Sequence, residues 1–319
     1  MRALVTGCAG FIGSHLTESL LDDGSGVIGI DCFNDNYGRP EKLRNLRRVS
    51  DWDNFEFAPI DLARGDLADI VGECEVVFHL AAEPGVRASW GRRFESYVRN
   101  NVMATQHLLE AASAQELQRF VYASSSSIYG QAERLPTSED VLPRPFSPYG
   151  MTKLSGEHLC LAYHANYGVP AVTLRYFSVY GPRQRPDMAF NRFCRAALQG
   201  ERIQVLGDGR QTRDFTFVAD VVEATRAAAT IPNLEGRVYN IGGGARVRLS
   251  QAISVLEDLA GKPIGVDHFP ALPGDVRDTG ADIAKAKTEL DYEPVTDLRK
   301  GLSAQLEWAA TGLQQARDA

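Results

Sequence analysis

The stretch that decides the fold opens the chain and reads Arg2-Ala3-Leu4-Val5-Thr6-Gly7-Cys8-Ala9-Gly10-Phe11-Ile12-Gly13. Its first part, 2–6, is a short apolar run that predicts a buried strand. Gly7 permits a tight turn, Gly10 lets a phosphate approach the backbone, and Gly13 lets a following helix lie close to the strand. Free N–H groups at the start of such a helix favour an anion. The stretch therefore predicts a strand–turn–helix unit that binds the diphosphate of a dinucleotide.

Outward from this unit, short apolar runs alternate with amphipathic stretches through the first half of the chain. Strands are predicted at 2–6, 26–30, 55–58, 75–80, 119–124 and 171–176. Helices are predicted between them at 11–22, 62–71, 94–113 and 149–167. Near-continuous apolar strands that alternate with helices are typical of a parallel sheet covered on both faces. We expect an α/β fold with a doubly wound parallel sheet, the Rossmann architecture.

The pattern loosens after residue 176. Helices are predicted at 188–199, 219–230, 250–260, 282–290 and 298–313, mixed with short strands at 203–206 and 237–241. We expect a nucleotide-binding domain over 1–176 and a smaller α/β substrate-binding domain over 177–319. The two are interleaved, because 237–241 reads as a strand that returns to the main sheet.

Composition narrows the class of protein. A length of 319 residues favours about two domains. The net charge of −7 argues against a nucleic-acid partner, and no apolar run is long enough to predict a membrane span. The N-terminus lacks the pattern of a signal peptide. Five scattered cysteines without a Cys-x-x-Cys pair indicate a reduced, cytoplasmic protein with no metal site.

Lysine is scarce, with 6 lysines against 28 arginines. Between Lys42 and Lys262 the chain keeps a single lysine, Lys153. A guanidinium is bulkier and planar, so a retained amine indicates a site that needs a compact ammonium. We therefore expect Lys153 to have a chemical role.

Acidic and small residues at strand ends extend the dinucleotide hypothesis. Asp31 ends the second strand, 18 residues after Gly13, where a carboxylate binds the adenosine ribose and disfavours the 2′-phosphate of NADP. NAD is therefore the predicted cofactor. Asp61 and Leu62 follow the third strand near the expected adenine, although an Asp there also suits a helix cap. Leu80, Ala81 and Ala82 follow the fourth strand, where the cofactor passes close to the backbone.

A second group of residues indicates proton chemistry. Tyr149 and Lys153 lie at positions i and i+4 of a predicted helix, so the phenol and the ammonium share one face. A nearby cation lowers the pKa of a tyrosine, which makes its phenolate a usable base. The serine run 124–127 ends the strand 119–124, at the edge of the sheet where ligands bind. An exposed pair and a polar turn are the structural alternatives.

Together these blocks resemble the extended short-chain dehydrogenase/reductase family and, within it, the nucleotide-sugar epimerases. Further blocks that match are His79-Leu80-Ala81-Ala82, Ile128-Tyr129-Gly130, Arg175-Tyr176-Phe177, Gly181-Pro182-Arg183, Arg213-Asp214-Phe215, Asn240-Ile241-Gly242 and Pro273-Gly274-Asp275-Val276-Arg277. The resemblance implies that Tyr149 is the base, that Lys153 holds the nicotinamide ribose and that Ser125 bonds the reacting hydroxyl. It also implies cofactor contacts from Phe11, Ile12, Asn34, Asn101 and Tyr176.

Other motifs are similar to the UDP-glucuronate 4-epimerases, namely Gly85-Val86-Arg87, Asp31-Cys32-Phe33-Asn34-Asp35-Asn36-Tyr37 and the stretch 177–188. Ser126 and Ser127 stand where related dehydratases carry an Asp-Glu pair, so elimination of water is not expected. Hydroxyls at Ser126, Ser127 and Ser178, with Arg185 as a charge partner, suit the carboxylate of a uronate. The chain departs from the pattern at Glu83-Pro84, where small or amide residues are usual, and at Ser178, where Thr is usual.

The resemblance also implies a site for the nucleotide. Arg213 and Arg277 match positions that hold a UDP diphosphate, and Arg87 and Arg192 are further candidates. Gln204 and Val205 are expected near the uracil, and Phe177 near the sugar.

The expected function is therefore a 4-epimerase of a UDP-sugar that interconverts UDP-glucuronate and UDP-galacturonate through a transient 4-keto sugar, with tightly bound NAD. Two other activities stay open at this stage: UDP-glucose/UDP-galactose 4-epimerase and UDP-glucuronate decarboxylase. The resemblance further implies a homodimer formed through the helices at 94–113 and 149–167.

Overall fold

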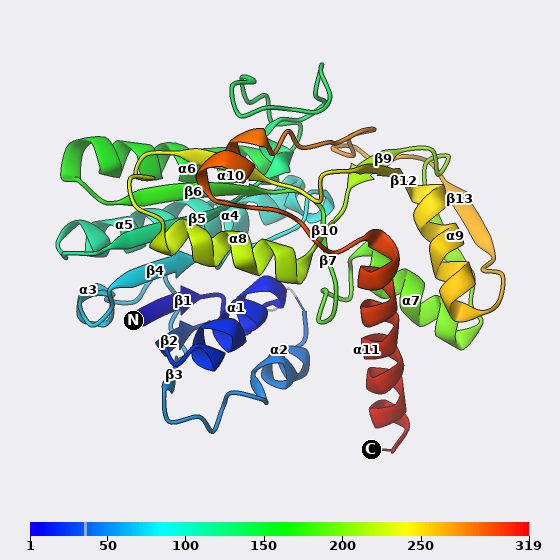
Figure 1. Cartoon of the computed structure of the whole chain (residues 1–319), viewed down its shortest axis with the longest axis horizontal. Helices are drawn as coiled ribbons and strands as arrows, with labels where there is room; N and C mark the ends of the chain where they lie inside the picture. Colours follow the sequence, from blue (N-terminus) through cyan, green and yellow to red (C-terminus); the bar gives the residue numbers. More distant parts are fainter. Residues whose placement is uncertain (35–36, 319) are drawn as a thin grey trace.

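A single parallel sheet of seven strands organises the computed structural model, which describes residues 1–34 and 37–318 (Figure 1). Across the sheet the order is β11-β6-β5-β4-β1-β2-β3. The strands are β1 (Arg2–Thr6), β2 (Gly26–Ile30), β3 (Phe55–Ala58), β4 (Val76–His79), β5 (Arg119–Ser125), β6 (Ala171–Tyr176) and β11 (Val238–Ile241). The chain winds outward from β1 in both directions, so the predicted doubly wound fold is confirmed.

Helices cover both faces of this sheet, each over its own apolar core. Within β5, Val121 points into one core and Phe120 into the other, which is why the strand is apolar at successive positions. The first core lies under α1 (Phe11–Asp22), α8 (Val218–Thr230) and α10 (Ala284–Glu289). The second lies under α3 (Ala68–Gly72), α5 (Ala104–Ser113) and α6 (Pro148–Tyr167).

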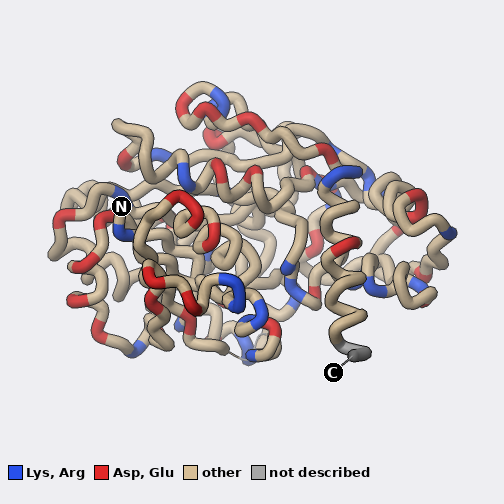
Figure 2. The backbone as a smooth tube through the Cα atoms, turned by 60° about the horizontal axis from the view of Figure 1, so that its bottom comes forward, with Lys and Arg blue, Asp and Glu red and all other residues tan. Residues whose placement is uncertain are grey.

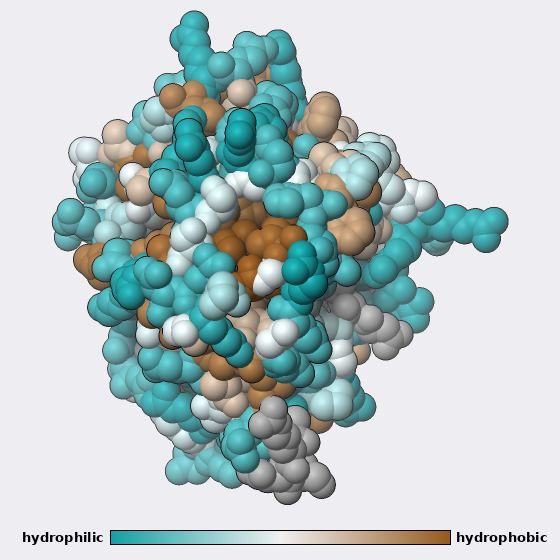
Figure 3. All heavy atoms as spheres, turned by 90° about the vertical axis from the view of Figure 1, so that its right-hand side faces the viewer, coloured by the Kyte–Doolittle hydropathy of each residue, from teal (hydrophilic) through white to brown (hydrophobic). Residues whose placement is uncertain are grey.

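A third core belongs to the part of the chain that lies beyond the carboxyl ends of the sheet strands (Figure 1). Here α7 (Ala189–Gln199), α9 (Leu249–Ala260) and α11 (Leu298–Asp318) pack around buried aromatic and aliphatic side chains. Figure 3 looks onto this face and shows apolar atoms gathered at its centre. Short strands complete this part: β7 (Val179–Tyr180) with β10 (Thr216–Phe217), β9 (Thr212–Asp214) with β12 (Arg246–Arg248), and β8 (Ile203–Leu206) with β13 (Val266–Phe269).

Three helical segments differ from the sequence prediction. The helix α2 (Arg39–Leu46) was not predicted, because it is polar along most of its length. The helix predicted at 62–71 is reduced to α3, because the carboxylate of Asp61 binds the N–H of Ala63 and starts a turn instead. The helix predicted at 94–113 contains a π-helical segment, η3 (Val98–Met103), and such segments are frequent at functional sites.

Across the described ranges, 1–34 and 37–318, no helix is long and apolar enough to cross a bilayer. Figure 2 shows Lys and Arg interspersed with Asp and Glu along the chain.

Candidate active site and cofactor cleft

The glycine turn after β1 forms the floor of a cleft at the carboxyl ends of the strands. Gly7 has a φ of +72°, and a Cβ there would lie 2.9 Å from the amide nitrogen of Ala81. A Cβ at Gly13 would lie 2.1 Å from the carbonyl oxygen of Gly7. Only glycine fits at either position, so the start of α1 lies directly against the turn and its free N–H groups face the cleft.

Most residues predicted to bind a cofactor line this cleft: Gly7, Gly10, Phe11, Ile12, Gly13, Asp31, Asn34, Asp61, Leu62, Leu80, Ala81, Ala82, Tyr149, Lys153 and Tyr176. Asn101 lies behind the wall instead. Its side-chain amide donates to the carbonyl of Glu83 and to the hydroxyl of Thr152, while its neighbour Asn100 lines the cleft. Asp35 and Asn36 of the predicted motif lie outside the described residues.

A buried ion pair fixes the acidic residue at the end of β2. Oδ1 of Asp31 accepts hydrogen bonds from Nζ of Lys42 at 2.9 Å and from the backbone N–H of Phe33 at 2.8 Å. Among the described residues no group donates to Oδ2, so this oxygen is available to ribose hydroxyls. Sequence reasoning missed Lys42, although only Lys42 and Lys153 of the six lysines are buried and both line the cleft. The scarcity of lysine was the signal that could have identified Lys42.

The cleft fits a dinucleotide on this structure's own evidence. The glycine turn brings backbone N–H groups to the cleft, and Oδ2 of Asp31, one strand further on, accepts no hydrogen bond from the described residues. Tyr37 adds a buried hydroxyl that has no hydrogen-bond partner among the described residues and lies near Gly10. A buried hydroxyl of this kind is costly unless a ligand satisfies it. The N–H groups of the glycine turn suit a diphosphate, and the carboxylate of Asp31 suits the adjoining adenosine ribose.

Tyr149 and Lys153 are held at the other end of the cleft by α6. The helix begins after Ser147, whose hydroxyl accepts from the N–H of Gly150 at 3.1 Å. One turn apart, the phenol and the ammonium both line the cleft. Nζ of Lys153 lies 4.5 Å from the centroid of the Tyr122 ring, a cation–π contact that stabilises the charged amine in the interior.

Burial dominates the ionisation of both groups. It lowers the pKa of Lys153 to about 8, and nearby Glu157 opposes this shift. Burial also raises the pKa of Tyr149, which hydrogen bonding to Ser125 and the charge of Arg185 partly offset. That Lys153 lowers the pKa of this tyrosine stays a prediction.

The serine run divides into two roles. Ser124 lines the first cleft and donates its hydroxyl to Glu157, which forms a buried ion pair with Arg175. Ser125 ends β5, and its hydroxyl accepts from the N–H of Ser127 at 3.2 Å while it faces Tyr149. Ser126 follows in the same tight turn, and Ser125, Ser126 and Ser127 are all half-buried. These three predicted residues are not among those that line the two clefts, so their contact with a substrate stays a prediction.

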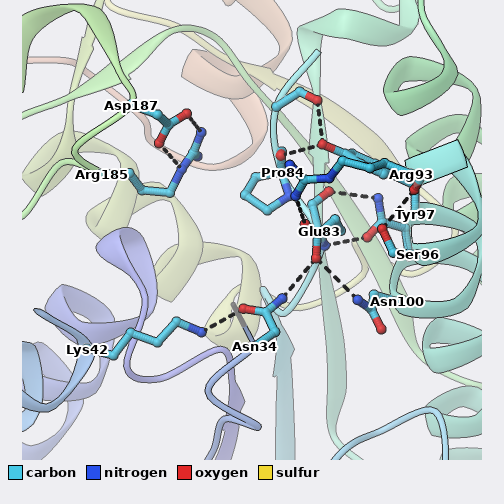
Figure 4. A network of polar contacts seen from close by, with 12 residues as sticks. Asn34, Lys42, Glu83, Pro84, Arg93, Ser96, Tyr97, Asn100, Arg185 and Asp187 are labelled. Atoms are coloured by element: carbon cyan, nitrogen blue, oxygen red, sulfur yellow. Dashed lines mark hydrogen bonds and ion pairs between the residues drawn. The ribbon is translucent and has the colours of Figure 1, made fainter. Parts of the chain in front are cut away.

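A second cleft lies in the C-terminal part of the chain. It is lined by the predicted substrate residues Arg87, Ser178, Arg192, Gln204, Val205 and Arg213. Arg185 lines the first cleft, yet its guanidinium bonds both carboxylate oxygens of Asp187 (3.0 and 2.9 Å), which lines the second. Figure 4 shows this ion pair. Because its two members line different clefts, the clefts lie next to each other here, and the charge of Arg185 acts on Tyr149 in the first cleft.

The arginines expected near a diphosphate all have partners within the protein. Arg87 makes two hydrogen bonds of 3.1 Å to Asp275. Arg213 donates to the backbone carbonyls of Thr212, Val276 and Arg277. The side chain of Arg277 is exposed and pairs with Asp208, outside the residues that line either cleft.

Phe177 also lies away from both clefts, because its ring is buried in the first core against Tyr129. Further lining residues were not predicted, among them Tyr37, Lys42, Pro84 and Asn100 in the first cleft and Gln211 and Phe215 in the second. Lys42, Asn100 and Gln211 stand outside the motifs that carried the prediction, whereas Tyr37 and Phe215 belong to them. Across the described residues, no His, Cys, Asp or Glu cluster could hold a metal ion.

Comparisons with known proteins agree with this geometry. Residues 3–242 match the model of the NAD dependent epimerase/dehydratase family. A protein of Bacillus subtilis (strain 168), described as an uncharacterized UDP-glucose epimerase, is 44% identical over 98% of each chain. The UDP-glucuronate 4-epimerase of Thermodesulfobacterium geofontis (strain OPF15) is 38% identical over 98% of this chain and 97% of its own.

A solved structure extends the likeness to three dimensions. The UDP-glucuronic acid 4-epimerase from Bacillus cereus, in complex with UDP-glucuronic acid and NAD, superposes with a TM-score of 0.95. It is 45% identical and covers 98% of this chain and 99% of its own. The resemblance inferred from the sequence is thereby confirmed, and the chain belongs to the NAD dependent epimerase/dehydratase family.

Proposed function

We propose that this protein is an NAD-dependent UDP-glucuronate 4-epimerase, which interconverts UDP-glucuronate and UDP-galacturonate. The observation that carries the proposal is the meeting of the two clefts, where Tyr149 and Lys153 share a wall with Arg185. A base and a carboxylate-binding cation are thus present at one point. The names of the relatives from Thermodesulfobacterium geofontis and Bacillus cereus support the same activity.

NAD is the cofactor of the first cleft. The N–H groups of the glycine turn bind its diphosphate, Asp31 binds the adenosine ribose through Oδ2, and Lys153 binds the nicotinamide ribose. When bound, NAD takes up the hydride from C4 of the sugar and gives it back, so the reaction has no net oxidation.

Tyr149 performs the proton chemistry. Its phenolate takes the proton from the O4 hydroxyl of the sugar as the C4–H bond breaks, which leaves a 4-keto sugar. Ser125 hydrogen-bonds the same oxygen, and the ammonium of Lys153 stabilises the phenolate. After the sugar turns over on its diphosphate, Tyr149 returns the proton to O4 while C4 is reduced on its other face.

With a uronate substrate, the site must also prevent the loss of CO₂ from the 4-keto sugar. Its 4-keto form is a β-keto acid, which loses CO₂ when the bond to the carboxylate aligns with the ketone. Arg185, with the hydroxyls of Ser126, Ser127 and Ser178, holds the carboxylate in a different orientation and so protects it. These contacts separate an epimerase from a decarboxylase.

The nucleotide half of the substrate occupies the second cleft. Arg87 and Arg213 lie at the diphosphate, and Arg192, which bonds Gln204 at 3.1 Å, lies at the uracil together with Val205. Arg277 joins the diphosphate once it exchanges Asp208 for a phosphate oxygen. This division assigns the cofactor to a domain of residues 1–176 with the strand β11, and the nucleotide to a domain within 177–319.

The protein acts as a homodimer in the cytoplasm. The helices α5 and α6 pack side by side and expose Met103, Met151 and Tyr167 along or beside them, which a second copy would cover. All five cysteines are free, which suits a reducing compartment.

The experiment that tests this function follows the sugar by NMR. Purified protein incubated with UDP-glucuronate is expected to yield UDP-galacturonate without added NADH and without CO₂. The second candidate is UDP-glucose 4-epimerase, which the name of the Bacillus subtilis relative favours. Turnover of UDP-glucose but not of UDP-glucuronate would replace the first proposal with the second.

A further inference from the structure

Glu83 is a buried carboxylate directly behind the wall of the cofactor cleft. Its side chain is only 6% exposed, and it follows Ala81 and Ala82, which line the wall. Oε2 accepts hydrogen bonds from the side-chain amides of Asn34 at 2.9 Å and of Asn100 at 3.3 Å (Figure 4). Both asparagines line the cleft, although Glu83 does not. One carboxylate thus joins two parts of the wall that are far apart in the sequence.

The topology places this junction across the cleft. β1 lies between β2 and β4 in the sheet. Asn34 belongs to the loop after β2, and Glu83 belongs to the loop after β4. A hydrogen bond between these loops must pass beyond the carboxyl end of β1, where the glycine turn that starts at Gly7 lies. The Asn34–Glu83 hydrogen bond therefore connects the loops on either side of the glycine turn, next to the proposed diphosphate site.

The same bond continues into the ribose end of the cleft. With its amide nitrogen turned to Glu83, Asn34 presents its oxygen to Nζ of Lys42 at 3.0 Å. Lys42 also bonds Asp31 at 2.9 Å, so one connected network runs from Glu83 to the carboxylate that faces the ribose. On the other side, Oε1 of Glu83 is 3.4 Å from the guanidinium of Arg93 (Figure 4).

The backbone of Glu83 is fixed as well. Its N–H donates to the side-chain oxygen of Asn101 at 2.6 Å, and its carbonyl accepts from the same side chain at 3.0 Å. The carboxylate is therefore held in place before any ligand arrives.

We infer that Glu83, Asn34 and Lys42 form a clasp over the cofactor cleft, and that Glu83 is the positioning residue that keeps NAD bound through many turnovers. The inference rests on the proposed function, in which NAD is regenerated in every cycle and needs no exchange. A carboxylate suits this task because it is an acceptor only and accepts from Asn34, Asn100 and Arg93 together. A glutamine at position 83 has only one acceptor oxygen. Its amide N–H group would face one of the N–H donors that the carboxylate now binds.

The test measures how fast bound NAD leaves the full-length protein in the absence of any UDP-sugar. For Glu83→Ala we expect NAD to dissociate at least about tenfold faster, which corresponds to 1.4 kcal/mol at 25 °C. Glu83→Gln is expected to fall between Glu83→Ala and the wild type. The matched control is Glu133→Ala, because Glu133 is 81% exposed and pairs with Arg144 in a surface loop. Added NAD is expected to restore the activity lost through cofactor release.

A second variant keeps the test decisive if Glu83→Ala does not fold. Asn34→Ala removes the other half of the bond and leaves the buried loop after β4 intact. It is expected to speed NAD release as well, and the two changes together are expected to have less than the sum of their separate effects, because both remove the shared Asn34–Glu83 bond. NAD release at the wild-type rate in both variants would overturn the clasp, as would activity that added NAD does not restore. A protein that holds NAD through the clasp but converts no UDP-sugar would overturn the proposed function instead.

Discussion

The two buried lysines show what single residues contribute to this site. Lys153 was predicted from its place one turn after Tyr149, and the structure puts both side chains in the cleft. Lys42 is as deeply buried, but its partners, Asp31 and Asn34, lie on a different element. Local sequence shows a pair on one helix, whereas an ion pair between a loop and a helix depends on the tertiary fold. For this reason the clasp around Glu83 was visible in the sequence only as a departure from the family pattern.

At this scale the base is the first residue to test. Tyr149→Phe removes the proton acceptor and keeps the ring, so kcat is expected to fall by about 10²–10⁴-fold. NAD is expected to stay bound, because the glycine turn, Asp31 and Lys153, which are proposed to bind its diphosphate and riboses, are unchanged. The matched control is Tyr167→Phe at the exposed end of the same helix, which is expected to keep the wild-type rate. A Tyr149→Phe protein with near-normal turnover would contradict the role of the phenol.

His79 makes the stability depend on pH. The imidazole is enclosed between the hydroxyls of Thr6 and Thr105, and burial lowers its pKa to about 3. The unfolded chain takes up a proton near its ordinary pKa of about 6.5, while the folded protein does not. Stability is therefore full above pH 6.5 and is lost as the pH falls toward 3.

At pH 5 the loss through this one group is about 2 kcal/mol. His79→Asn is expected to lose less stability than the wild type between pH 7 and pH 5, as measured by urea unfolding at both pH values. An equal loss in the two proteins would show that His79 does not titrate in this way.

At the scale of elements, strands were easier to predict than helices. The strands β1, β2, β3 and β6 match their predicted ranges. All but β3 are buried along most of their length, which gives the mainly apolar runs typical of parallel strands. The helix α2 was missed because it is polar, and it is tied to the sheet through Lys42 and Asp31. The π-helical segment η3 left no periodic signal in the sequence, although it carries Asn100 and Asn101.

The contact between α1 and the glycine turn yields a prediction for these elements. A Cβ at Gly13 would collide with the carbonyl of Gly7, so Gly13→Ala must push α1 away from β1. We expect a loss of about 1–3 kcal/mol in the free energy of unfolding, together with weaker NAD binding. Gly312→Ala is the control, because a Cβ there has no atom within 4 Å and alanine favours a helix. Thermal unfolding and NAD titration measure both effects, and an unchanged Gly13→Ala protein would disprove the close approach.

At the scale of the whole molecule, the site depends on two clefts that come from distant parts of the chain. Sequence motifs indicated the residues of each cleft but not their meeting point, since the Arg185–Asp187 pair joins neighbours that face different clefts. Phe177 and Arg277 stood in matching motifs, yet one lies in the core and the other at the surface. A sequence motif identifies which residues lie near a site, but whether a given side chain points into the site depends on its tertiary packing.

The proposed dimer is also a property of the whole molecule. Met151→Glu places a charge on the exposed face of α6 and is expected to convert the dimer into monomers, as measured by light scattering after gel filtration. Leu142→Glu changes an exposed residue in a loop, and this control is expected to remain dimeric. Monomers in the wild type, or a dimer that survives Met151→Glu, would argue against assembly through α5 and α6.

In the proposed reaction one carbon, C4, is oxidised and reduced again within a single bound substrate. The direct measurement uses UDP-glucuronate that carries deuterium at C4, incubated with the protein in ordinary water, with the product read by proton NMR and mass spectrometry. We expect UDP-galacturonate that keeps its deuterium at C4. The absence of UDP-galacturonate, or a product whose C4 carries hydrogen from the solvent, would rule out this reaction.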